Sequence, residues 1–163
     1  MDIRTSRETL ERTNIPNPRS TASVAGHPFH PMLVPFPIAF FVATFAADIG
    51  YALFGNTGWV LASEWLLGAG LTFAGLAAIA GLTDFFGDRR IRRLNASWWH
   101  MGGNLAAVAI SAWNFYVRYH SGAAHGLNSA WTLVSLAVVL ILLFTGWKGW
   151  EMVYRHRVGV ADY

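Results

Sequence analysis

The residues with the clearest capacity for chemistry are histidines that lie where apolar segments begin or end. His27 and His30 belong to the stretch GHPFHP, residues 26–31, which precedes a long apolar run. His100 lies near the start of another apolar run, and His156 follows the last one. Neutral imidazole nitrogens bind haem iron and ions of Zn, Fe or Cu. These four histidines are therefore the candidate ligands of a haem or metal site.

Four apolar runs, nearly free of charge, have to position these histidines. They cover residues of about 32–54, 59–83, 97–117 and 129–153. Each run can cross a hydrocarbon core ~30 Å thick at ~1.5 Å per helical residue. Only 13% of the 163 residues are charged, against about 25% in an ordinary soluble domain. The sequence thus predicts an all-α fold for residues 23–160, an integral membrane four-helix bundle with antiparallel helices.

The polar segment before the bundle, residues 1–22, lacks the apolar core of a cleavable signal peptide. We expect it to be a mostly disordered tail. The chain contains no cysteine, which excludes disulfide bonds, c-type haem and cysteine-ligated iron–sulfur clusters. A cofactor would therefore be held by histidines, by carboxylates or by shape alone.

Basic residues are concentrated at one end of the predicted bundle. Of the twelve Lys and Arg residues, all but Arg118 fall on the side that holds both termini. The positive-inside rule then predicts cytoplasmic termini, N-in and C-in, in an inner membrane. A loop on that side carries four arginines that we expect to contact anionic lipid headgroups, namely Arg89, Arg90, Arg92 and Arg93. Nucleic acid is not an expected partner, because acidic residues and the membrane surface lie beside these arginines.

The same topology brings the four histidines to the cytoplasmic end of the bundle. Asp84 and Glu151 end predicted helices at this level, so they add two carboxylates to the cluster. His120 and His125 fall in the opposite loop, where we expect them to be solvated. The plain alternative is that the clustered histidines are interfacial anchors, as Trp and Tyr often are at this depth.

Residues of the third predicted helix recur at intervals of four and three, which places them on one face. This stripe consists of His100, Asn104, Ala107, Ser111, Asn114 and Arg118. Lipid cannot satisfy its polar groups, so the stripe must face the protein interior. Asp48 of the first helix also needs a partner inside the bilayer, and Asn114 and Arg118 are the candidates. Glycines of the second helix, such as Gly75 and Gly81, are expected to allow close helix packing, and the alternative is that they make room for a flat macrocycle.

Four motifs carry a family resemblance. The stretches GHPFHPMLVPFPIAFF, GLTDFF, HMGGNL and GWKGWEMVYRHRVGV together resemble the bacterial membrane family catalogued as domain of unknown function 2231. The likeness runs from about Gly26 to Val160. It implies a four-helix domain in a bacterial inner membrane, with no established activity. It also implies motif positions at His27, His30, Asp84, His100, Asn104, Glu151, Tyr154 and His156.

The resemblance adds one hint and one departure. Members of the family occur fused or adjacent to redox modules such as Rieske-type domains, which suggests electron transfer. In this chain Pro35 stands where the family pattern LVHFPI has a polar residue, often His. One potential ligand is therefore absent.

Three functions remain open on these residues. The first is a redox or electron-transfer subunit that binds haem b through His30 or His27 opposite His100, with His156 as a substitute. The second is an accessory or structural subunit of a larger respiratory or photosynthetic membrane complex, without a cofactor of its own. The third is a non-haem metal site in which the four histidines bind Zn, Fe or Cu beside a carboxylate.

Around either kind of site we expect five supporting residues, with an arginine among them for haem propionates. They are Asp84, Asn104, Glu151, Tyr154 and Arg155. The sequence holds no nucleophile elbow, phosphate loop or paired catalytic carboxylates. It therefore assigns no catalytic residue.

Overall fold

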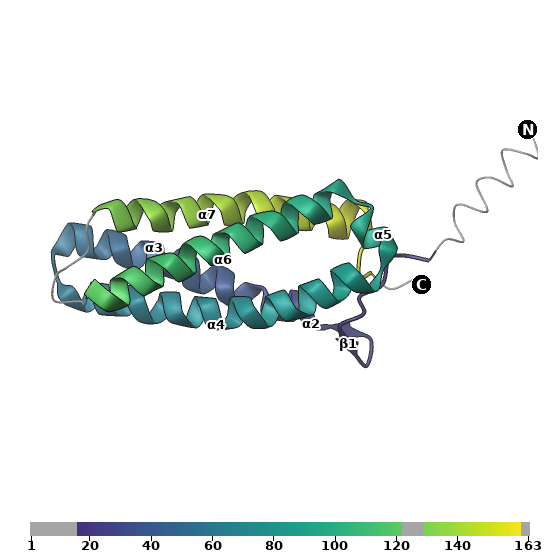
Figure 1. Cartoon of the computed structure of the whole chain (residues 1–163), viewed down its shortest axis with the longest axis horizontal. Helices are drawn as coiled ribbons and strands as arrows, with labels where there is room; N and C mark the ends of the chain where they lie inside the picture. Colours follow the sequence, from purple (N-terminus) through teal and green to yellow (C-terminus); the bar gives the residue numbers. More distant parts are fainter. Residues whose placement is uncertain (1–15, 122–128, 161–163) are drawn as a thin grey trace, which may run out of the picture.

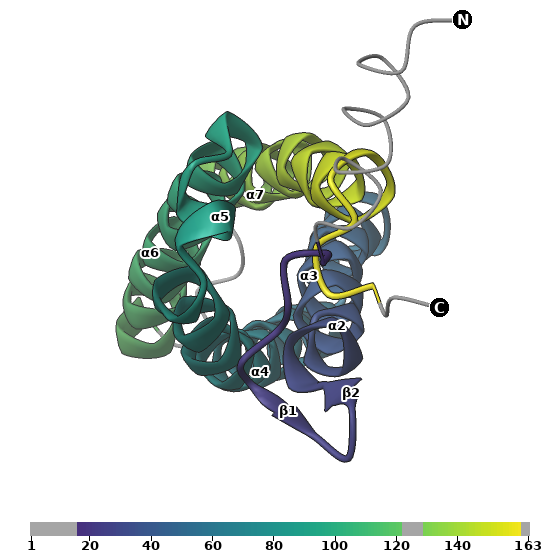
Figure 2. The same ribbon diagram turned by 90° about the vertical axis from the view of Figure 1, so that its right-hand side faces the viewer.

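The computed structural model describes residues 16–121 and 129–160. In this part of the chain four long helices run alongside one another (Figure 1), α3 (Pro35–Phe54), α4 (Thr57–Gly87), α6 (Asn95–Ser121) and α7 (Ser129–Trp150). Figure 2, drawn along their length, shows the four helices around a common axis, with α3 opposite α6 and α4 opposite α7. We call this arrangement the bundle.

Short elements gather at one end of the bundle, which we call the terminal end (Figure 1). They are the strands β1 (Ser23–Val24) and β2 (His27–Pro28), the helices α2 (Phe29–Leu33) and α5 (Arg89–Arg92), and the π-helix η2 (Glu151–Arg155). At the far end α3 stops at Gly55, whose φ of 66° is left-handed. Asn56 then caps α4 by accepting a hydrogen bond from the Gly58 amide at 2.8 Å.

Three described segments are long and apolar enough to cross a membrane. They are Phe29–Phe54, which joins α2 to α3, Thr57–Gly87, and Ala130–Arg155. Pro35 does not interrupt the first, because it lies at the start of α3, where a proline is tolerated. The fourth predicted span, α6, has 27 residues but a lower mean hydropathy because of its polar stripe. The coarse prediction of a helical membrane protein is confirmed, with three candidate spans.

The helices extend beyond the apolar runs from which they were predicted. The run at 59–83 is part of a helix that continues to Gly87, and the run at 97–117 is part of one that begins at Asn95. The added residues include Asp84 near the end of α4 and Asn95 at the start of α6, so an apolar run stops short of them, whereas a helix continues until a capping residue ends it. Asp88 provides that cap between α4 and α5, since its side chain accepts from the Arg90 amide.

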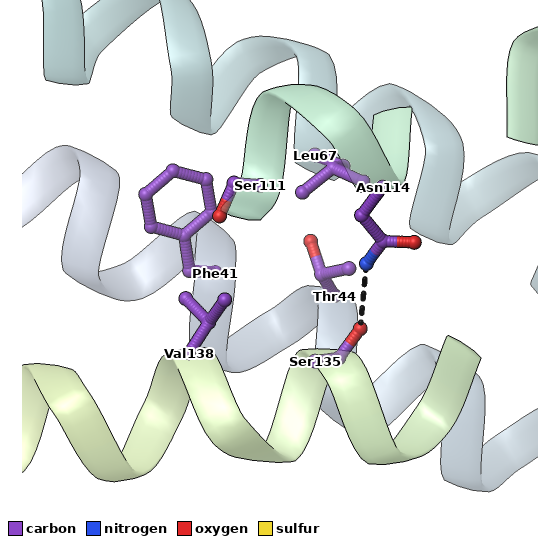
Figure 3. Close-up of a pocket in the computed structure, with 7 residues that line it drawn as sticks. All are labelled: Phe41, Thr44, Leu67, Ser111, Asn114, Ser135 and Val138. Carbon is purple, nitrogen blue, oxygen red and sulfur yellow. Dashed lines mark hydrogen bonds between the residues drawn. The ribbon is translucent and has the colours of Figure 1, made fainter. Parts of the chain in front are cut away.

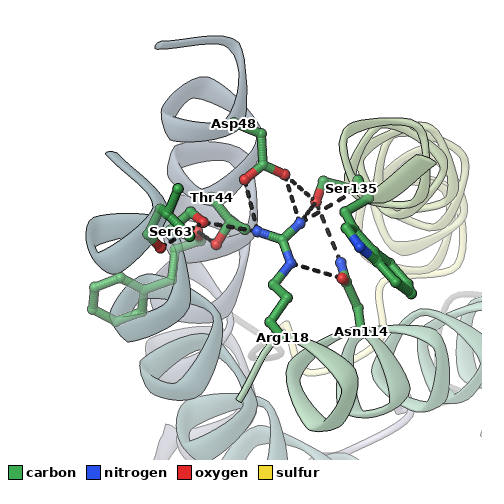
Figure 4. Close-up of polar contacts among 9 residues, drawn as sticks. Thr44, Asp48, Ser63, Asn114, Arg118 and Ser135 are labelled. Carbon is green, nitrogen blue, oxygen red and sulfur yellow. Dashed lines mark hydrogen bonds and ion pairs between the residues drawn. The ribbon is translucent and has the colours of Figure 1, made fainter. Parts of the chain in front are cut away.

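A buried ion pair joins the two helices that face each other across the axis. Both terminal nitrogens of Arg118, on α6, donate to the carboxylate of Asp48, on α3, at 2.7 Å (Figure 4). The two side chains are 2% and 0% exposed. The predicted pairing of Asp48 with Arg118 is confirmed, and the second candidate, Asn114, accepts from the Arg118 Nε at 2.8 Å.

Three further groups complete this polar core. Ser63 accepts from Arg118 at 2.7 Å, and Ser135 donates to Asp48 at 2.7 Å. The Trp131 carbonyl accepts from Arg118 at 3.3 Å. Because every helix of the bundle contributes to this network, it acts as a common anchor. Its apolar neighbours in the core are Phe41, Leu67, Ala74, Ala107 and Val138.

We expect the Asp48–Arg118 pair to show strong coupling in a double-mutant cycle. Asp48→Asn or Arg118→Met leaves one buried charge without its partner, which costs about 3–5 kcal/mol of unfolding free energy. The double variant buries no charge, so its loss should be far smaller than the sum of the two single losses. Unfolding in detergent, monitored by tryptophan fluorescence, measures the unfolding free energy of the wild-type protein, the two single variants and the double variant.

A matched control is Arg155→Met, because Arg155 is 72% exposed beside Glu151. Such an exposed pair contributes about 0–1 kcal/mol. Additive losses in the double variant of the buried pair would show that the two charges do not depend on each other.

Candidate functional site

His30, on α2, is fixed against α4 by one of its ring nitrogens. Its Nδ1 lies 2.8 Å from the carbonyl oxygen of Ala77. A carbonyl only accepts, so Nδ1 carries the proton and donates. The ring lies over Gly81, one helical turn further along α4, where an added Cβ would come within 2.8 Å of Nδ1 and Cε1. The missing side chain at Gly81 therefore opens the Ala77 carbonyl to the imidazole.

His100, on α6, repeats this arrangement against α7. Its Nδ1 lies 2.8 Å from the carbonyl oxygen of Thr145, and its ring lies over Gly149. A Cβ at Gly149 would come within 3.1 Å of the ring Cε1. Each histidine thus donates to the carbonyl of a residue four positions before a glycine. We call this combination of imidazole, carbonyl and glycine a histidine clamp.

The two clamps bring the imidazoles of His30 and His100 together. Their ring centroids are 6.1 Å apart and their planes are inclined by 83°. Because Nδ1 is protonated in each neutral ring, Nε2 carries the lone pair. Among the described residues neither Nε2 has a hydrogen-bond partner. Both Nε2 atoms are therefore free to act as ligands.

The separation of the rings suits two ligands on opposite sides of one metal ion. With metal–nitrogen bonds of ~2.0–2.1 Å, two such imidazoles have ring centres about 6.3 Å apart. The observed centroids are 6.1 Å apart. A carbonyl that accepts from the other ring nitrogen also raises the basicity of a histidine ligand and fixes its orientation. In number and in ring separation the two imidazoles therefore match the ligands of an ion that takes two histidines.

Asn104, predicted as a supporting residue, links the His100 clamp to its surroundings. Its Nδ2 donates to the His100 carbonyl at 2.7 Å, and its Oδ1 accepts from the Thr145 hydroxyl at 3.1 Å. Thr145 is buried and provides the carbonyl that His100 contacts. Asn104 therefore holds α6 and α7 in register at the clamp.

The other predicted ligands lie elsewhere at the terminal end. His27, on β2, is exposed, and its Nδ1 contacts the Ala25 carbonyl at 3.0 Å. His156 follows η2, and its amide donates to the Glu151 carbonyl. Within residues 16–121 and 129–160 no three His, Asp or Glu side chains form a group able to hold a metal ion. The predicted cluster of four histidines is thus a pair in the structure.

The remaining supporting residues predicted at η2 contact one another. Glu151 accepts from Lys148 at 2.9 Å and from Arg155 at 3.3 Å. Tyr154 is 71% exposed, and its ring lies 5.5 Å from that of Trp150. Exposed aromatic rings of this kind suit the interfacial region of a bilayer. Arg155, expected near haem propionates, is instead paired with Glu151.

Asp84 secures the chain that crosses the terminal end. Its Oδ1 accepts from the Ala22 amide at 2.7 Å and from the Ser20 hydroxyl at 2.8 Å. Residues 16–22, which we call the strap, run across this end of the bundle (Figure 2). The Pro18 carbonyl accepts from the Gly159 amide at 2.8 Å, so the strap also meets the C-terminal segment.

The strap belongs to the segment 1–22 that we expected to be a mostly disordered tail. Residues 16–22 make specific hydrogen bonds, and residues 1–15 lie outside the described part of the chain. Asp88 also contacts the strap, since it accepts from the Arg19 amide at 3.3 Å. Hydrogen bonds from Arg90 hold the pKa of Asp88 at about 2, below its usual value, so this carboxylate is ionised at neutral pH.

Two pockets lie away from the candidate site, and neither is lined by His30 or His100. The first lies in the middle of the bundle and is too small for a water molecule (Figure 3), lined by Phe41, Thr44, Leu67, Ser111, Asn114, Ser135 and Val138. The second, of about 410 Å³, is an apolar groove on the outer side of α2 and α4. The candidate site is therefore defined by the Nε2 atoms of His30 and His100 and not by a pocket.

A signal for the clamps is present in the sequence, in the spacing of glycines within the apolar helices. Gly81, expected to allow close helix packing, leaves room for the His30 ring. The pairs Ala77 and Gly81, and Thr145 and Gly149, share a spacing of four within an apolar helix. A glycine one turn after an exposed carbonyl marks a place where a side-chain donor can reach a helix backbone.

We expect alanine at the clamp glycines to be destabilising. Gly81→Ala pushes the His30 ring away from the Ala77 carbonyl, and the lost hydrogen bond costs about 1–3 kcal/mol of unfolding free energy. Gly149→Ala should have the same effect on His100, more weakly, because its contact is longer. Thermal unfolding in detergent measures the change.

Gly75→Ala and Gly146→Ala are matched controls on the same helices, since a Cβ there meets nothing within 4 Å. Both should be neutral or stabilise by up to about 1 kcal/mol, because alanine favours a helix over glycine. Equal behaviour of the clamp and control variants would contradict the role given to the clamps.

Comparison with protein families supplies one match. The model of a family described as Predicted membrane protein (DUF2231) matches residues 26–162. No curated protein and no solved structure matches the chain. The match confirms the family that the sequence resembles.

Proposed function

Because the chain belongs to the DUF2231 family of predicted membrane proteins, we propose that its four long helices form an antiparallel bundle and all span the membrane. From the geometry of the two histidines we propose, separately, that the bundle binds haem b. In this proposal α6 is the fourth span. Its polar side chains turn inward, where Ser111, Asn114 and Arg118 are buried. Its outward side chains include Trp98, Trp99, Leu105, Trp113 and Tyr116, all exposed. That pattern suits a helix with lipid on one side and a polar core on the other.

In this proposal the terminal end lies at the cytoplasmic surface of an inner membrane, with both termini inside. Arg90 donates to Asp88 and to carbonyls of the strap, and Arg92 donates to the Phe86 carbonyl. Arg89 and Arg93 are exposed. These two arginines are the ones best placed for anionic lipid headgroups, at about 1 kcal/mol each.

The orientation can be tested with reporters fused to the C-terminus. A fluorescent protein that matures only in the cytoplasm should be bright there, and alkaline phosphatase, which needs an oxidising compartment, should be inactive. The opposite pair of results would invert the topology. Replacing Arg89 and Arg93 by Gln should weaken the binding of anionic lipid to the detergent-solubilised protein and leave the binding of neutral lipid unchanged.

The observation that carries haem binding is the pair of free Nε2 atoms on His30 and His100. The imidazoles come from opposite helices, and their centroids are 6.1 Å apart. Four-helix bundles commonly hold cofactors between side chains of facing helices. Haem iron held by two histidines supplies one-electron transfer. The function proposed is therefore that of a redox or electron-transfer subunit.

Residues of this chain would tune and protect that site. The Ala77 and Thr145 carbonyls accept the Nδ1 protons and so strengthen both ligands. The strap, held by Asp84, crosses the same end of the bundle (Figure 2) and would limit access of water from the cytoplasm. Trp and Tyr side chains around this end, among them Trp98, Trp99, Trp147, Trp150 and Tyr154, are exposed toward the lipid.

An accessory role without a cofactor is the second candidate function. It is favoured by the clamps themselves, since each ties one helix to its neighbour through Nδ1. A larger redox membrane complex would then be the partner. A non-haem site for Zn, Fe or Cu is less well supported, because no third His, Asp or Glu joins the pair among the described residues.

The reduced-minus-oxidised visible spectrum tests haem binding directly. Protein purified in mild detergent after expression with ample haem should show sharp α and Soret bands. The double variant His30→Ala/His100→Ala should lose them, because it lacks both histidines that would hold the iron. The control double variant His27→Ala/His120→Ala removes two exposed imidazoles and should keep the bands.

A featureless spectrum from folded wild-type protein would overturn haem binding and leave the accessory role. Metal analysis of the same sample then reports any bound Zn, Fe or Cu. Bands that persist in the His30/His100 double variant would place the haem elsewhere.

A further inference from the structure

The bundle contains a repeat that residue identities conceal. Positions in α2 and α3 match positions in α6 at an offset of 70 residues, so that His30 corresponds to His100 and Asp48 to Arg118. Positions in α4 match positions in α7 at an offset of 68, so that Gly81 corresponds to Gly149. We call two positions related in this way mates. Few mates are the same residue, which explains why the sequence shows no obvious repeat.

Burial follows the same two offsets at the positions that meet in the middle of the bundle. Four pairs of mates on the first helix of each half are buried together, namely Pro37 with Ala107, Phe41 with Ser111, Thr44 with Asn114, and Asp48 with Arg118. Three pairs on the second helix are also buried together, namely Leu67 with Ser135, Gly70 with Val138, and Ala77 with Thr145. The relation ends near the helix ends, where buried Gly50 has the exposed mate His120 and buried Ala80 the half-buried mate Lys148. Each half therefore turns the same side toward the middle of the bundle.

The arrangement of the helices has the matching symmetry. Figure 2 shows α3 opposite α6 and α4 opposite α7, as a half-turn about the long axis requires. Three pairs of mates line the central pocket, namely Phe41 with Ser111, Thr44 with Asn114, and Leu67 with Ser135 (Figure 3). The pocket, the ion pair and the histidine pair all lie where mates meet. They therefore lie on the axis.

We propose that the chain consists of two tandem copies of one helical hairpin, which form its two halves. The His30–His100 pair is then a single two-fold ligand site on the axis between these halves. Each half supplies one equivalent imidazole, fixed by its own clamp. The ligand is a centre that takes one imidazole on each face, here the iron of the haem proposed above. This inference rests on the proposed function for the identity of that ligand.

Two equivalent donors leave no open face on the centre. The site then suits electron transfer, and it does not suit binding of a small gas or a substrate at the iron.

The other end of the axis shows why the halves are not interchangeable. Two identical hairpins would place like charges at positions 48 and 118, whereas here Asp48 meets Arg118 at 2.7 Å. Opposite charges favour pairing of unlike halves.

Carbon monoxide tests the ligand site, because it binds only where the reduced iron has an open position. The reduced wild-type protein should show no spectral change with carbon monoxide. His30→Ala and His100→Ala should each open one face, so each single variant should bind it. Added imidazole should restore the wild-type spectrum in both, which a purely structural defect would not allow.

The outcomes separate this inference from the proposed function. Wild-type protein that binds carbon monoxide, or a response in only one of the single variants, would overturn the two-fold site while haem binding stands. Folded protein without haem would overturn the proposed function and the ligand of this site together.

Charge exchange tests the axis without any cofactor. Asp48→Arg and Arg118→Asp each place two like charges together, so each should lose most of its folded yield in detergent. The exchanged variant Asp48→Arg/Arg118→Asp restores an ion pair between mates and should recover most of that yield. Adding the exchange of their neighbours, Thr44→Asn and Asn114→Thr, should improve it further. An exchanged variant as poorly folded as the single ones would overturn the two-fold relation.

Discussion

The buried ion pair between Asp48 and Arg118 sets the rotation of the two helices that face each other across the bundle. A charge within the hydrocarbon region has to turn inward and find a partner, and here each finds the other at 2.7 Å. His30 precedes Asp48 by 18 residues, and His100 precedes Arg118 by 18. Eighteen residues make about five helical turns, or ~27 Å. The helix faces that turn Asp48 and Arg118 to the axis therefore also turn the two histidines to it.

This relation explains which parts of the site the sequence could predict. The inward stripe of α6 and the partner of Asp48 follow from the bilayer, which leaves buried charges few choices. The depth of a residue follows from the order of the spans, so four histidines were correctly expected at one end. The direction in which a side chain points depends on the rotation of its helix about the helix axis. His30 and His100 each lie 18 positions before a member of the ion pair, and this shared interval would have selected them from the four histidines.

Other features depend on contacts that no local pattern encodes. His27 is directed outward by a tight turn in which Ala25 and Gly26 have φ of 50° and 79°. The strap is bound to Asp84 across more than 60 residues of chain, and its sequence resembles any polar tail. Apolar length identifies three spans but not α6, because the same polar stripe that anchors the core lowers the hydropathy of that helix.

The clamps show that a structural and a ligand role need not compete at one histidine. Nδ1 of each ring uses the second lone pair of a helix carbonyl, which is accessible because the residue one turn later is a glycine. That bond ties the helices and also fixes the proton, so Nε2 keeps its lone pair. An imidazole tied only for packing could present either nitrogen to the carbonyl, in any direction. Both rings instead use Nδ1, and their centroids lie 6.1 Å apart, so the lone pairs of both Nε2 atoms remain available to a ligand.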